Sequence, residues 1–211
     1  MLKRCFDLLL VIVTAPFWLP LLGLVALSVW FTMGRPVWFR QQRPGFKGQP
    51  FILLKFRTMR QGSGNDEERL TAWGRWLRRS SLDELPELLN VLRGEMSLVG
   101  PRPLLMEYLT RYSPEQARRH EVLPGLTGWA QVHGRNSVDW NERFALDRWY
   151  VDHHTFWIDI KILYKTIGLV IRGQGITPAQ SKIMPVFPGN NDPMTGKHDP
   201  DANSQRGHCN R

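Results

Sequence analysis

Residues 8–33, LLLVIVTAPFWLPLLGLVALSVWFTM, form an apolar run without one charged side chain. At about 1.5 Å per residue, a helix over this run could cross a hydrocarbon core of roughly 30 Å. The run is longer than the apolar part of a signal peptide, which has about 7–15 residues. No small-x-small cleavage site precedes Arg35. The run therefore predicts a retained membrane anchor.

Two prolines interrupt the anchor. Pro16 and Pro20 each remove an intrahelical hydrogen bond and push against the preceding turn, so we expect the helix to break there. Both flanks are basic, with Lys3 and Arg4 before the run and Arg35, Arg40 and Arg43 after it. A single span normally has its basic flank on one side only. Two topologies stay open: a re-entrant helix over residues 1–35 that returns to the cytoplasmic side, and a kinked transmembrane span.

The composition fits one catalytic domain with anionic partners. The chain has 211 residues, enough for one good core. Its net charge of +9 and its pI of about 10.1 indicate nucleic acid, anionic lipid or phosphorylated substrates as partners. The nine Trp residues favour a membrane interface. Cys5 and Cys209 lie at opposite ends of the chain, which argues against a disulfide framework and for a reducing compartment.

Beyond the anchor, the patterns predict an α+β fold that is mainly helical, with one small antiparallel β-hairpin. The hairpin strands are expected at 37–42 and 51–57, joined by a turn with Pro44, Gly45 and Gly48. A further short strand is expected at 129–132, and 97–103 should be a loop. Helical periodicity predicts helices at 67–78, 82–92 (ended by Gly94), 106–122, 138–151 and 156–172.

These elements should form a cytoplasmic catalytic domain over residues 36–186. The helix at 156–172 could lie in the core or in the membrane interface, and the core is the default expectation. The chain from residue 187 to residue 211 is polar and poor in large apolar residues, so a disordered tail is expected there.

The segment RRSSLDELP, residues 78–86, is the sharpest candidate for chemistry. Proline is tolerated in the first turn of a helix, which favours Asp83 over Ser81 as the N-cap before Pro86. An Asp at this helix end should stay ionised beside a bound phosphate, as a phosphoryl-transfer nucleophile requires. The competing interpretation is a plain helix cap. Asp83 and Glu84 point about 100° apart on a helix, so one should meet phosphorus and the other a metal or a proton.

Basic residues in loops and at element ends form the second candidate group, and they are Lys55, Arg57, Arg78, Arg102 and Arg135. The arginine fork suits phosphate oxygens, and the frame Gly100-Pro101-Arg102-Pro103 limits the backbone of Arg102. An aspartate with an arginine cluster on a phosphorylated substrate implies a divalent ion, most often Mg²⁺, with Asp83 and Glu84 as its ligands.

Two other pairs resemble metal motifs and are discounted. Asp199-Pro200-Asp201 spells D-x-D but lies in the polar tail. His153 and His154 are adjacent on a predicted helix, where their side chains diverge.

Several long motifs resemble the bacterial sugar transferase family, whose members are monotopic phosphoglycosyl transferases. The match runs in order from residue 3 to about residue 172. It comprises the proline-broken anchor and the segments KRCFD (3–7), RPG (43–45), KFRTM (55–59), LDELPELLNVLRGEMSLVGPRPL (82–104), PGLTGWAQVHGRN (124–136), LDRWYV (146–151) and FWIDIKI (156–162). Without the extra N-terminal transmembrane domain of larger members, the chain is similar to the minimal form, such as the undecaprenyl-phosphate diacetylbacillosamine-1-phosphate transferase.

This resemblance implies a two-step reaction at the cytoplasmic face of the bacterial inner membrane. Asp83 would attack a UDP-sugar, expected to be N-acetylated, and release UMP. Undecaprenyl phosphate would then take the sugar phosphate from Asp83, giving undecaprenyl-diphosphate-sugar as a first membrane step of glycoconjugate or polysaccharide assembly. Glu84 would assist Mg²⁺ binding or proton transfer, and Arg78 and Arg102 would clamp phosphate oxygens.

The resemblance also implies that Gly134, Arg135 and Asn136 lie near the nucleotide, and that the anchor is re-entrant. One position departs from the pattern: Ala15 precedes Pro16, where small members often have Ser, whose hydroxyl can help to bend a helix.

Two other functions stay open. One is sugar-phosphate transfer without a covalent intermediate, with Asp83 only capping the helix or holding Mg²⁺. The other is a non-enzymatic, membrane-tethered basic module that binds nucleic acid or lipid. It explains the charge but not the Asp-Glu and Gly-Pro-Arg-Pro motifs, so no nucleic-acid partner is expected. The sugar, the pathway and the oligomeric state, including a homodimer, are left open.

Overall fold

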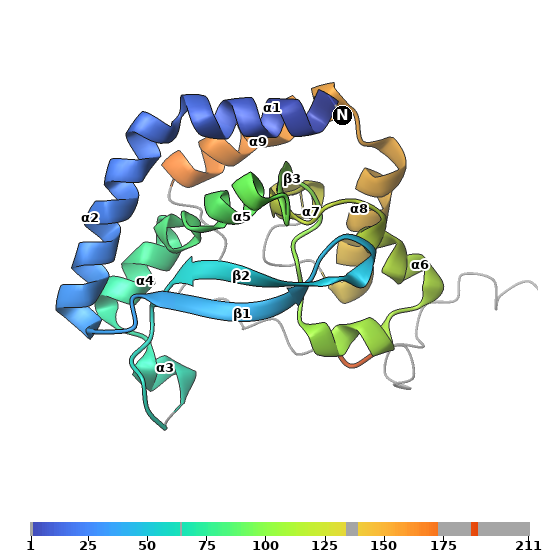
Figure 1. Ribbon diagram of the computed structural model, residues 1–211. Helices are drawn as coiled ribbons and strands as arrows, with labels where there is room; N and C mark the ends of the chain where they lie inside the picture. Colours follow the sequence, from blue (N-terminus) through green and yellow to red (C-terminus); the bar gives the residue numbers. More distant parts are fainter. Residues whose placement is uncertain (1, 64, 134–138, 173–186, 190–211) are drawn as a thin grey trace, which may run out of the picture.

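The computed structural model describes residues 2–63, 65–133, 139–172 and 187–189 (Figure 1). It confirms a mainly helical α+β fold with one small antiparallel hairpin. The larger elements are α1 (Leu2–Val13), α2 (Ala15–Met33), β1 (Trp38–Pro44), β2 (Pro50–Phe56), α4 (Ala72–Arg79), α5 (Glu87–Arg93), α8 (Trp140–His153) and α9 (Phe156–Ile171). The shorter ones are η1 (Phe46–Gly48), α3 (Asp66–Arg69), η2 (Leu82–Glu84), β3 (Ser97–Val99), η3 (Met106–Arg111), α6 (Pro114–Ala117), η4 (Arg118–Glu121), β4 (Gly125–Thr127) and α7 (Trp129–His133).

The helix break in the anchor lies at Thr14, just before the first of the two prolines. Figure 1 shows α1 along the top of the molecule and α2 turning down at its end. The Thr14 hydroxyl donates to the carbonyl of Leu10 (2.6 Å), one turn back in α1. Pro16 sits in the first turn of α2, where no hydrogen bond is lost. The expectation that Pro20 also breaks the helix is wrong, because α2 continues through it.

The N-terminal helix is joined to the rest of the fold by polar contacts. The Lys3 ammonium lies 2.5 Å from a carboxylate oxygen of Asp159 in α9. The Arg4 guanidinium donates to the carbonyls of Val91 (2.6 Å) and Leu92 (3.1 Å), the orphan acceptors in the last turn of α5. These bonds fix α1 against both α9 and α5. The sequence KRCFD is thus a structural clamp as well as a basic flank.

The hairpin forms as predicted, with bounds shifted by one or two residues. Trp38 pairs with Phe56 at its open end and Pro44 with Pro50 at its turn. The turn requires a positive φ at Lys47 (52°) and Gly48 (73°). Alternation along β2 buries Leu53 against the main core, while Lys55, two residues on, is only partly buried. The hairpin therefore places Lys55, expected at a strand end, within reach of the carboxyls of Glu84 and Glu87.

A second, parallel strand pair was not predicted. Ser97 in β3 pairs with Gly125 in β4, and Val99 pairs with Thr127. The expected strand at 129–132 is instead the short helix α7, and 97–99 is strand rather than loop. A Cβ atom on Gly125 would come within 2.0 Å of the Gly100 nitrogen. The two backbone segments can therefore approach this closely only because Gly100 and Gly125 have no side chain.

Three predicted helices are interrupted, and the one expected at 82–92 divides into η2 and α5. The helix expected at 106–122 divides into η3, α6 and η4, because Tyr112 is extended and Ser113 starts a new capping box with Gln116. The helix expected at 67–78 divides into α3 and α4, because Leu70 is extended and Thr71 caps α4. The helices expected at 138–151 and 156–172 are confirmed as α8 and α9, and Gly94 caps α5 with a φ of 86°.

The expected tail boundary at residue 187 is wrong in its detail. Phe187 is 2% exposed and packs with Tyr108 and Phe144 in the third core cluster. Its amide donates to the Tyr108 hydroxyl (3.1 Å). Residues 187–189 therefore belong to the packed domain.

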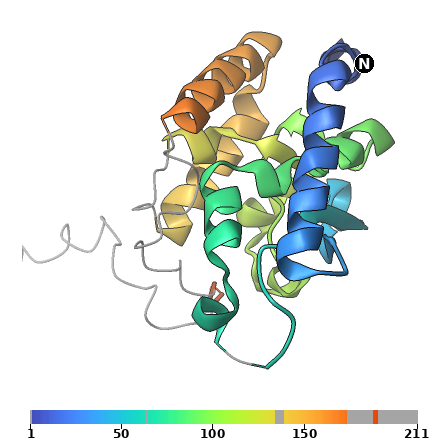
Figure 2. The same ribbon diagram turned by 90° about the vertical axis from the view of Figure 1, so that its left-hand side faces the viewer.

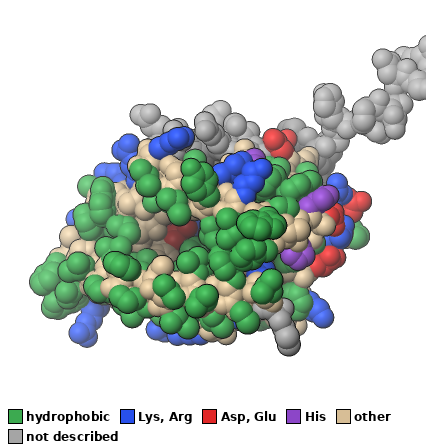
Figure 3. All heavy atoms as spheres, turned by 90° about the horizontal axis from the view of Figure 1, so that it is seen from above, with side chains coloured by type: hydrophobic (Ala, Val, Ile, Leu, Met, Phe, Trp, Pro, Cys, Tyr) green, Lys and Arg blue, Asp and Glu red, His purple; other side chains and the backbone are tan. Residues whose placement is uncertain are grey.

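One face of the molecule is apolar. α1 and α2 expose large apolar side chains, and α9 adds Trp157, Tyr164, Ile167 and Ile171. Figure 3, which looks onto α1 from above, shows hydrophobic side chains spread over this face. By length and composition, α2 is the one helix among the described residues that could cross a membrane. Helix α9 is only half a core helix: Ile162 is fully buried, while its opposite side is exposed.

Candidate active site

Asp83 and Glu84 lie in the turn η2 between α4 and α5. Ser81, with a φ of 58°, reverses the chain after α4, and the Glu84 amide then donates to the Ser81 carbonyl (3.2 Å). The prediction that Asp83 is the N-cap of the next helix is wrong. The α-helix begins at Glu87, after Pro86 in the N-cap position, because a 3₁₀ turn takes up residues 82–84.

Glu84 is enclosed by cations. Its Oε1 accepts from Lys55 Nζ (2.6 Å) and from Arg102 Nη2, and its Oε2 lies 3.4 Å from Arg102 Nη1. Burial of this carboxyl would raise its pKa, but Arg102 and Lys55 outweigh burial and hold the pKa well below the usual range. Glu84 is therefore a fixed anion whose oxygens are already engaged by the protein.

Lys55 links two carboxyls. Besides Glu84, it contacts Glu87 Oε1 at 3.1 Å. Burial, with a further contribution from the Glu84 charge, raises the pKa of Glu87 to about 7, against the attraction of Lys55. Lys55 is thus held in place from two sides, in the first turn of α5 and in η2.

Asp83 has the opposite surroundings. It is 8% exposed, yet its carboxyl forms no hydrogen bond or ion pair with the part of the chain that the structure describes. Burial and the neighbouring Glu84 raise its pKa to about 6, although Lys55, Arg102 and Arg78 oppose the shift. A shielded carboxylate that lies near three cations and is paired with none of them can act on a ligand.

Figure 3 shows that the apolar face is hollowed, with an acidic side chain visible at the floor of the hollow. Figure 2 places α2 and α9 on opposite sides of the segment that contains α4 and α5. The turn that carries Asp83 and Glu84 joins α4 to α5. The acidic pair therefore belongs to a segment framed by the two helices that expose apolar side chains.

The structure separates the remaining predicted site residues. Arg78 Nε donates to Thr58 Oγ1 (2.9 Å), which anchors the side chain at the end of α4 beside the site. Arg57 instead donates to backbone carbonyls after α2, including Gly34 (2.7 Å) and Arg35 (3.3 Å). This engagement favours a structural role for Arg57 over phosphate binding. Gly134, Arg135 and Asn136, like Asp199 and Asp201, lie outside the described residues.

Arg102 is positioned by a buried network that the sequence analysis missed. Arg119 donates to the Arg102 carbonyl (2.7 Å) and to the Tyr112 hydroxyl (3.2 Å), and it lies 2.8 Å from Asp147. Arg119 and Asp147 are both almost fully buried. Asp147 lies within the LDRWYV motif, which could have pointed to it. Its partner Arg119 lies in a segment without a recognised motif.

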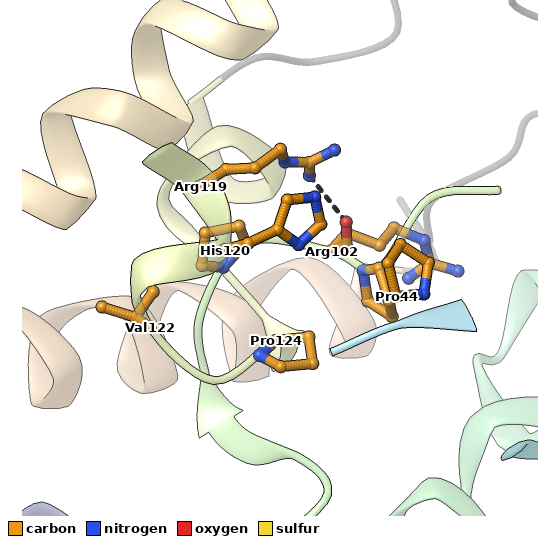
Figure 4. A pocket seen from close by; sticks show the side chains of 8 residues that line it. Pro44, Arg102, Arg119, His120, Val122 and Pro124 are labelled. Atoms are coloured by element: carbon orange, nitrogen blue, oxygen red, sulfur yellow. Dashed lines mark hydrogen bonds between the residues drawn. The ribbon is translucent and has the colours of Figure 1, made fainter. Parts of the chain in front are cut away.

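Figure 4 shows the other side of this arrangement, with Arg119 bonded to the Arg102 carbonyl behind a shallow hollow. The lining of this hollow includes Pro44, Val122 and Pro124. His120 lines it as well, with Nδ1 3.2 Å from the Gly45 carbonyl. Asp83 does not line it. The prolines fix the backbone that carries Arg102 and form no ligand site with the acidic pair.

Arg43, in the RPG motif, is a further basic residue that the sequence analysis did not select. Burial, with a further contribution from the charge of Arg102, lowers the pKa of Arg43. Its Nε atom is buried without a hydrogen-bond partner, while Nη2 donates to Gln41 (2.6 Å). A buried guanidinium donor of Arg43 without a partner in the described residues favours an anionic ligand here.

The donor set for a divalent ion is small. The described residues contain no group of three or more His, Cys, Asp or Glu side chains that could hold a metal ion. Mg²⁺, however, is commonly held by one or two carboxylates together with substrate phosphates and water. The unpaired carboxylate of Asp83 fits that pattern. Glu84 fits it only through an oxygen shared with Lys55 or Arg102.

Comparison with known proteins finds several relatives of this chain. A relative in Bacillus subtilis (strain 168), the uncharacterized sugar transferase EpsL, is 50% identical over 201 residues, covering 90% of this chain and 98% of EpsL. The undecaprenyl-phosphate galactose phosphotransferase of Salmonella typhimurium is 39% identical over 200 residues, with 82% of this chain but 41% of that protein covered. The UDP-glucose:undecaprenyl-phosphate glucose-1-phosphate transferase of Caulobacter vibrioides is 42% identical over 181 residues, or 78% of this chain and 68% of that one.

The chain thus matches EpsL over nearly its whole length and spans about two fifths of the Salmonella protein. The sequence model of one family, the bacterial sugar transferases, matches residues 1–173, which include the anchor, the acidic turn and the Gly-Pro-Arg-Pro frame. The chain therefore belongs to the bacterial sugar transferase family.

Proposed function

We propose that the chain transfers a sugar-1-phosphate from a UDP-sugar to undecaprenyl phosphate at the cytoplasmic face of the bacterial inner membrane. Two characterised relatives carry this chemistry in their names, one for galactose and one for glucose. The observation that carries the proposal is the contrast between Asp83 and Glu84: one buried carboxyl is unpaired beside cations, and the next is locked by them.

In the first step, a carboxylate oxygen of Asp83 attacks the β-phosphorus of the UDP-sugar. The bond between that phosphorus and the oxygen bridging to the α-phosphate breaks, and UMP leaves with the bond's electron pair. The product is a phosphosugar esterified to Asp83. Among the cations that act on the Asp83 carboxyl, Arg78 and Arg102 have the guanidinium forks that suit phosphate oxygens, and Arg43, whose pKa is lowered by Arg102, adds a third guanidinium.

In the second step, a phosphate oxygen of undecaprenyl phosphate attacks the phosphorus on Asp83. The acyl phosphate bond breaks, the Asp83 carboxylate is restored, and undecaprenyl-diphosphate-sugar is released. The apolar face over α1, α2 and α9 supports a lipid acceptor, since a lipid phosphate approaches from the membrane side.

Glu84 acts through its partners in this proposal. It holds Lys55 and Arg102 in place and balances their charge, so that the two cations do not collapse onto Asp83. Mg²⁺, when bound, supplies charge neutralisation on the diphosphate, and Asp83 with Glu84 are the residues that would hold it.

The covalent route is tested by UMP release without lipid. The full chain in detergent, incubated with UDP-sugar and Mg²⁺, should release about one UMP per chain and stop. A matched Asp83→Asn variant should fold normally and release none, because an amide oxygen is a poor nucleophile. UMP release that requires undecaprenyl phosphate would support transfer without a covalent intermediate, and near-native turnover of the Asn variant would remove Asp83 as the nucleophile.

The donor sugar is identified by a screen of UDP-sugars in the presence of undecaprenyl phosphate. Galactose and glucose are named in the relatives, and neither is N-acetylated. The screen therefore has to contain both sugar classes. UMP release from UDP-N-acetyl sugars alone would support the expectation from the resemblance, and release from UDP-glucose or UDP-galactose would replace it.

A further inference from the structure

Helix α9 has a basic flank beside its exposed apolar side. Trp157, Tyr164 and Ile171 are between 77% and 80% exposed, while Ile162, on the opposite side, is fully buried. Lys161 and Lys165 are four residues apart and therefore lie on one flank of the helix, next to the exposed aromatic side chains.

The positive charge on this flank is not neutralised within the described residues. Neither Lys161 nor Lys165 forms an ion pair there, and Asp159, the acidic residue of α9, is taken by Lys3. Lys165 Nζ instead donates to His133 Nε2 at 2.6 Å, which requires an imidazole that is neutral at that nitrogen. Burial lowers the pKa of His133, and Lys165 and Lys161 lower it further. The Lys165 ammonium thus lies against a neutral histidine, and Lys161 lies one helical turn away on the same flank.

Aromatic rings stand beside this cluster. The Trp129 ring centroid is 3.7 Å from that of His133 and 4.2 Å from that of Trp149, and the Lys165 ammonium lies 5.8 Å from the Trp129 centroid. Trp is the residue type that favours the boundary between hydrocarbon and headgroups. Figure 3 shows Lys or Arg side chains beside a histidine among the hydrophobic side chains of the same face.

We propose that Lys161, Lys165 and His133 form a binding site for the headgroup phosphate of an anionic phospholipid. The occupant follows from the surroundings. The apolar side of α9 is continuous with that of α1 and α2, so the site lies where acyl chains meet headgroups. An anionic headgroup supplies the counter-charge that the described residues do not, and the Lys stems can lie along the acyl chains.

Lipid retention tests the proposal. The full chain in non-ionic detergent is incubated with equal amounts of phosphatidylglycerol and phosphatidylcholine, and bound lipids are counted by native mass spectrometry. The wild-type chain should retain phosphatidylglycerol in preference. Lys161→Gln/Lys165→Gln should lose about thirtyfold of that preference, since each lysine near an anionic surface contributes about fivefold.

Two further variants keep the test decisive. Lys161→Gln alone changes an exposed side chain that makes no packing contact in the core and should cost about fivefold. Lys47→Gln removes an exposed lysine from the hairpin turn and should leave the preference unchanged. Equal retention of both lipids by the wild type, an unchanged preference in the double variant, or an equal loss in Lys47→Gln would overturn the site.

Discussion

Asp83 and Glu84 are neighbours in the chain with opposite environments, and the proposed mechanism gives them different roles for this reason. The motif identified both as reactive, but adjacency cannot tell which carboxyl is engaged. That depends on Lys55, 29 residues from Glu84, and on Arg102, 18 residues from it. The bonds of Arg119 to Arg102 and Asp147 were likewise unpredictable, because they join three segments that only the fold brings together.

Removal of the Glu84 charge should damage both stability and activity. Glu84→Gln leaves Lys55 and Arg102 without their shared anion in a mostly buried place, so the free energy of unfolding should fall by about 2–4 kcal/mol. UMP release should also slow, since the two cations are no longer held apart from Asp83.

The matched control is Glu67→Gln on α3, where the side chain is exposed. Both variants are compared with the wild type by denaturant unfolding in detergent and by the UMP assay. Equal stability of Glu84→Gln and Glu67→Gln would contradict the role given to Glu84.

His120 should make the fold sensitive to acid. Burial and the nearby Arg119 lower the pKa of His120 to about 4 from an ordinary 6.5. The folded state then binds fewer protons than the unfolded state between these values, so the contribution of His120 is fully present above pH 6.5. It is lost as the pH falls towards 4. The loss is on the order of 3 kcal/mol.

The measurement is the unfolding free energy of the wild type and of His120→Gln between pH 7.5 and pH 4. The difference between the two proteins should shrink, or reverse in sign, as the pH falls, because Gln does not titrate. A difference that stays constant over this range would show that His120 is not held neutral by the fold.

Among the elements, those with long periodic patterns were predictable and those set by single residues were not. Helices α8 and α9 and the hairpin follow from apolar spacing and turn residues. The pair β3–β4 has three residues in each strand and depends on close approach at Gly100 and Gly125, which no periodicity reports. The break at Ser113 was hidden inside an amphipathic pattern.

Gly125→Ala should abolish the β3–β4 contact. The new methyl group would meet the Gly100 backbone at 2.0 Å and the Thr127 carbonyl at 2.4 Å, and backbone cannot move aside cheaply. We expect a loss of more than about 3 kcal/mol of stability, or failure to fold. In Gly168→Ala, where nothing lies within 4 Å, stability should rise by up to about 1 kcal/mol. Thermal unfolding compares both, and similar melting temperatures would contradict the close approach.

The path of α1 and α2 through the membrane can also be tested. The bend at Thr14 supports a re-entrant path, in which α2 does not reach the far side of the membrane. In a chain with Cys5 and Cys209 changed to Ser, the variant Phe17→Cys (80% exposed) should resist a membrane-impermeant thiol reagent added from the periplasmic side. Lys47→Cys in the hairpin is the control and should react only from the cytoplasmic side. Periplasmic labelling of residue 17 would restore a kinked span.

The whole molecule combines an apolar face with basic residues at its edge and a polar site beneath. The composition gives the net charge and the number of Trp residues but not their positions. In the structure, the exposed side of α9 extends the apolar surface of α1 and α2. The default expectation of a core helix at 156–172 failed for half of its side chains. Amphipathicity alone does not show whether the apolar side of a helix faces the protein core or a membrane.

The bond from Lys3 to Asp159 ties the anchor to α9, and the bonds from Arg4 to Val91 and Leu92 tie it to α5, the helix that follows the acidic turn. The anchor thereby fixes the depth of the acidic turn relative to the bilayer. In the proposed reaction, the Asp83 carboxylate would stay at one height relative to the bilayer, and undecaprenyl phosphate would have to present its phosphate at that height. Bilayer thickness then becomes a variable of catalysis, and a membrane that is too thick or too thin would slow the second step while leaving the release of UMP untouched.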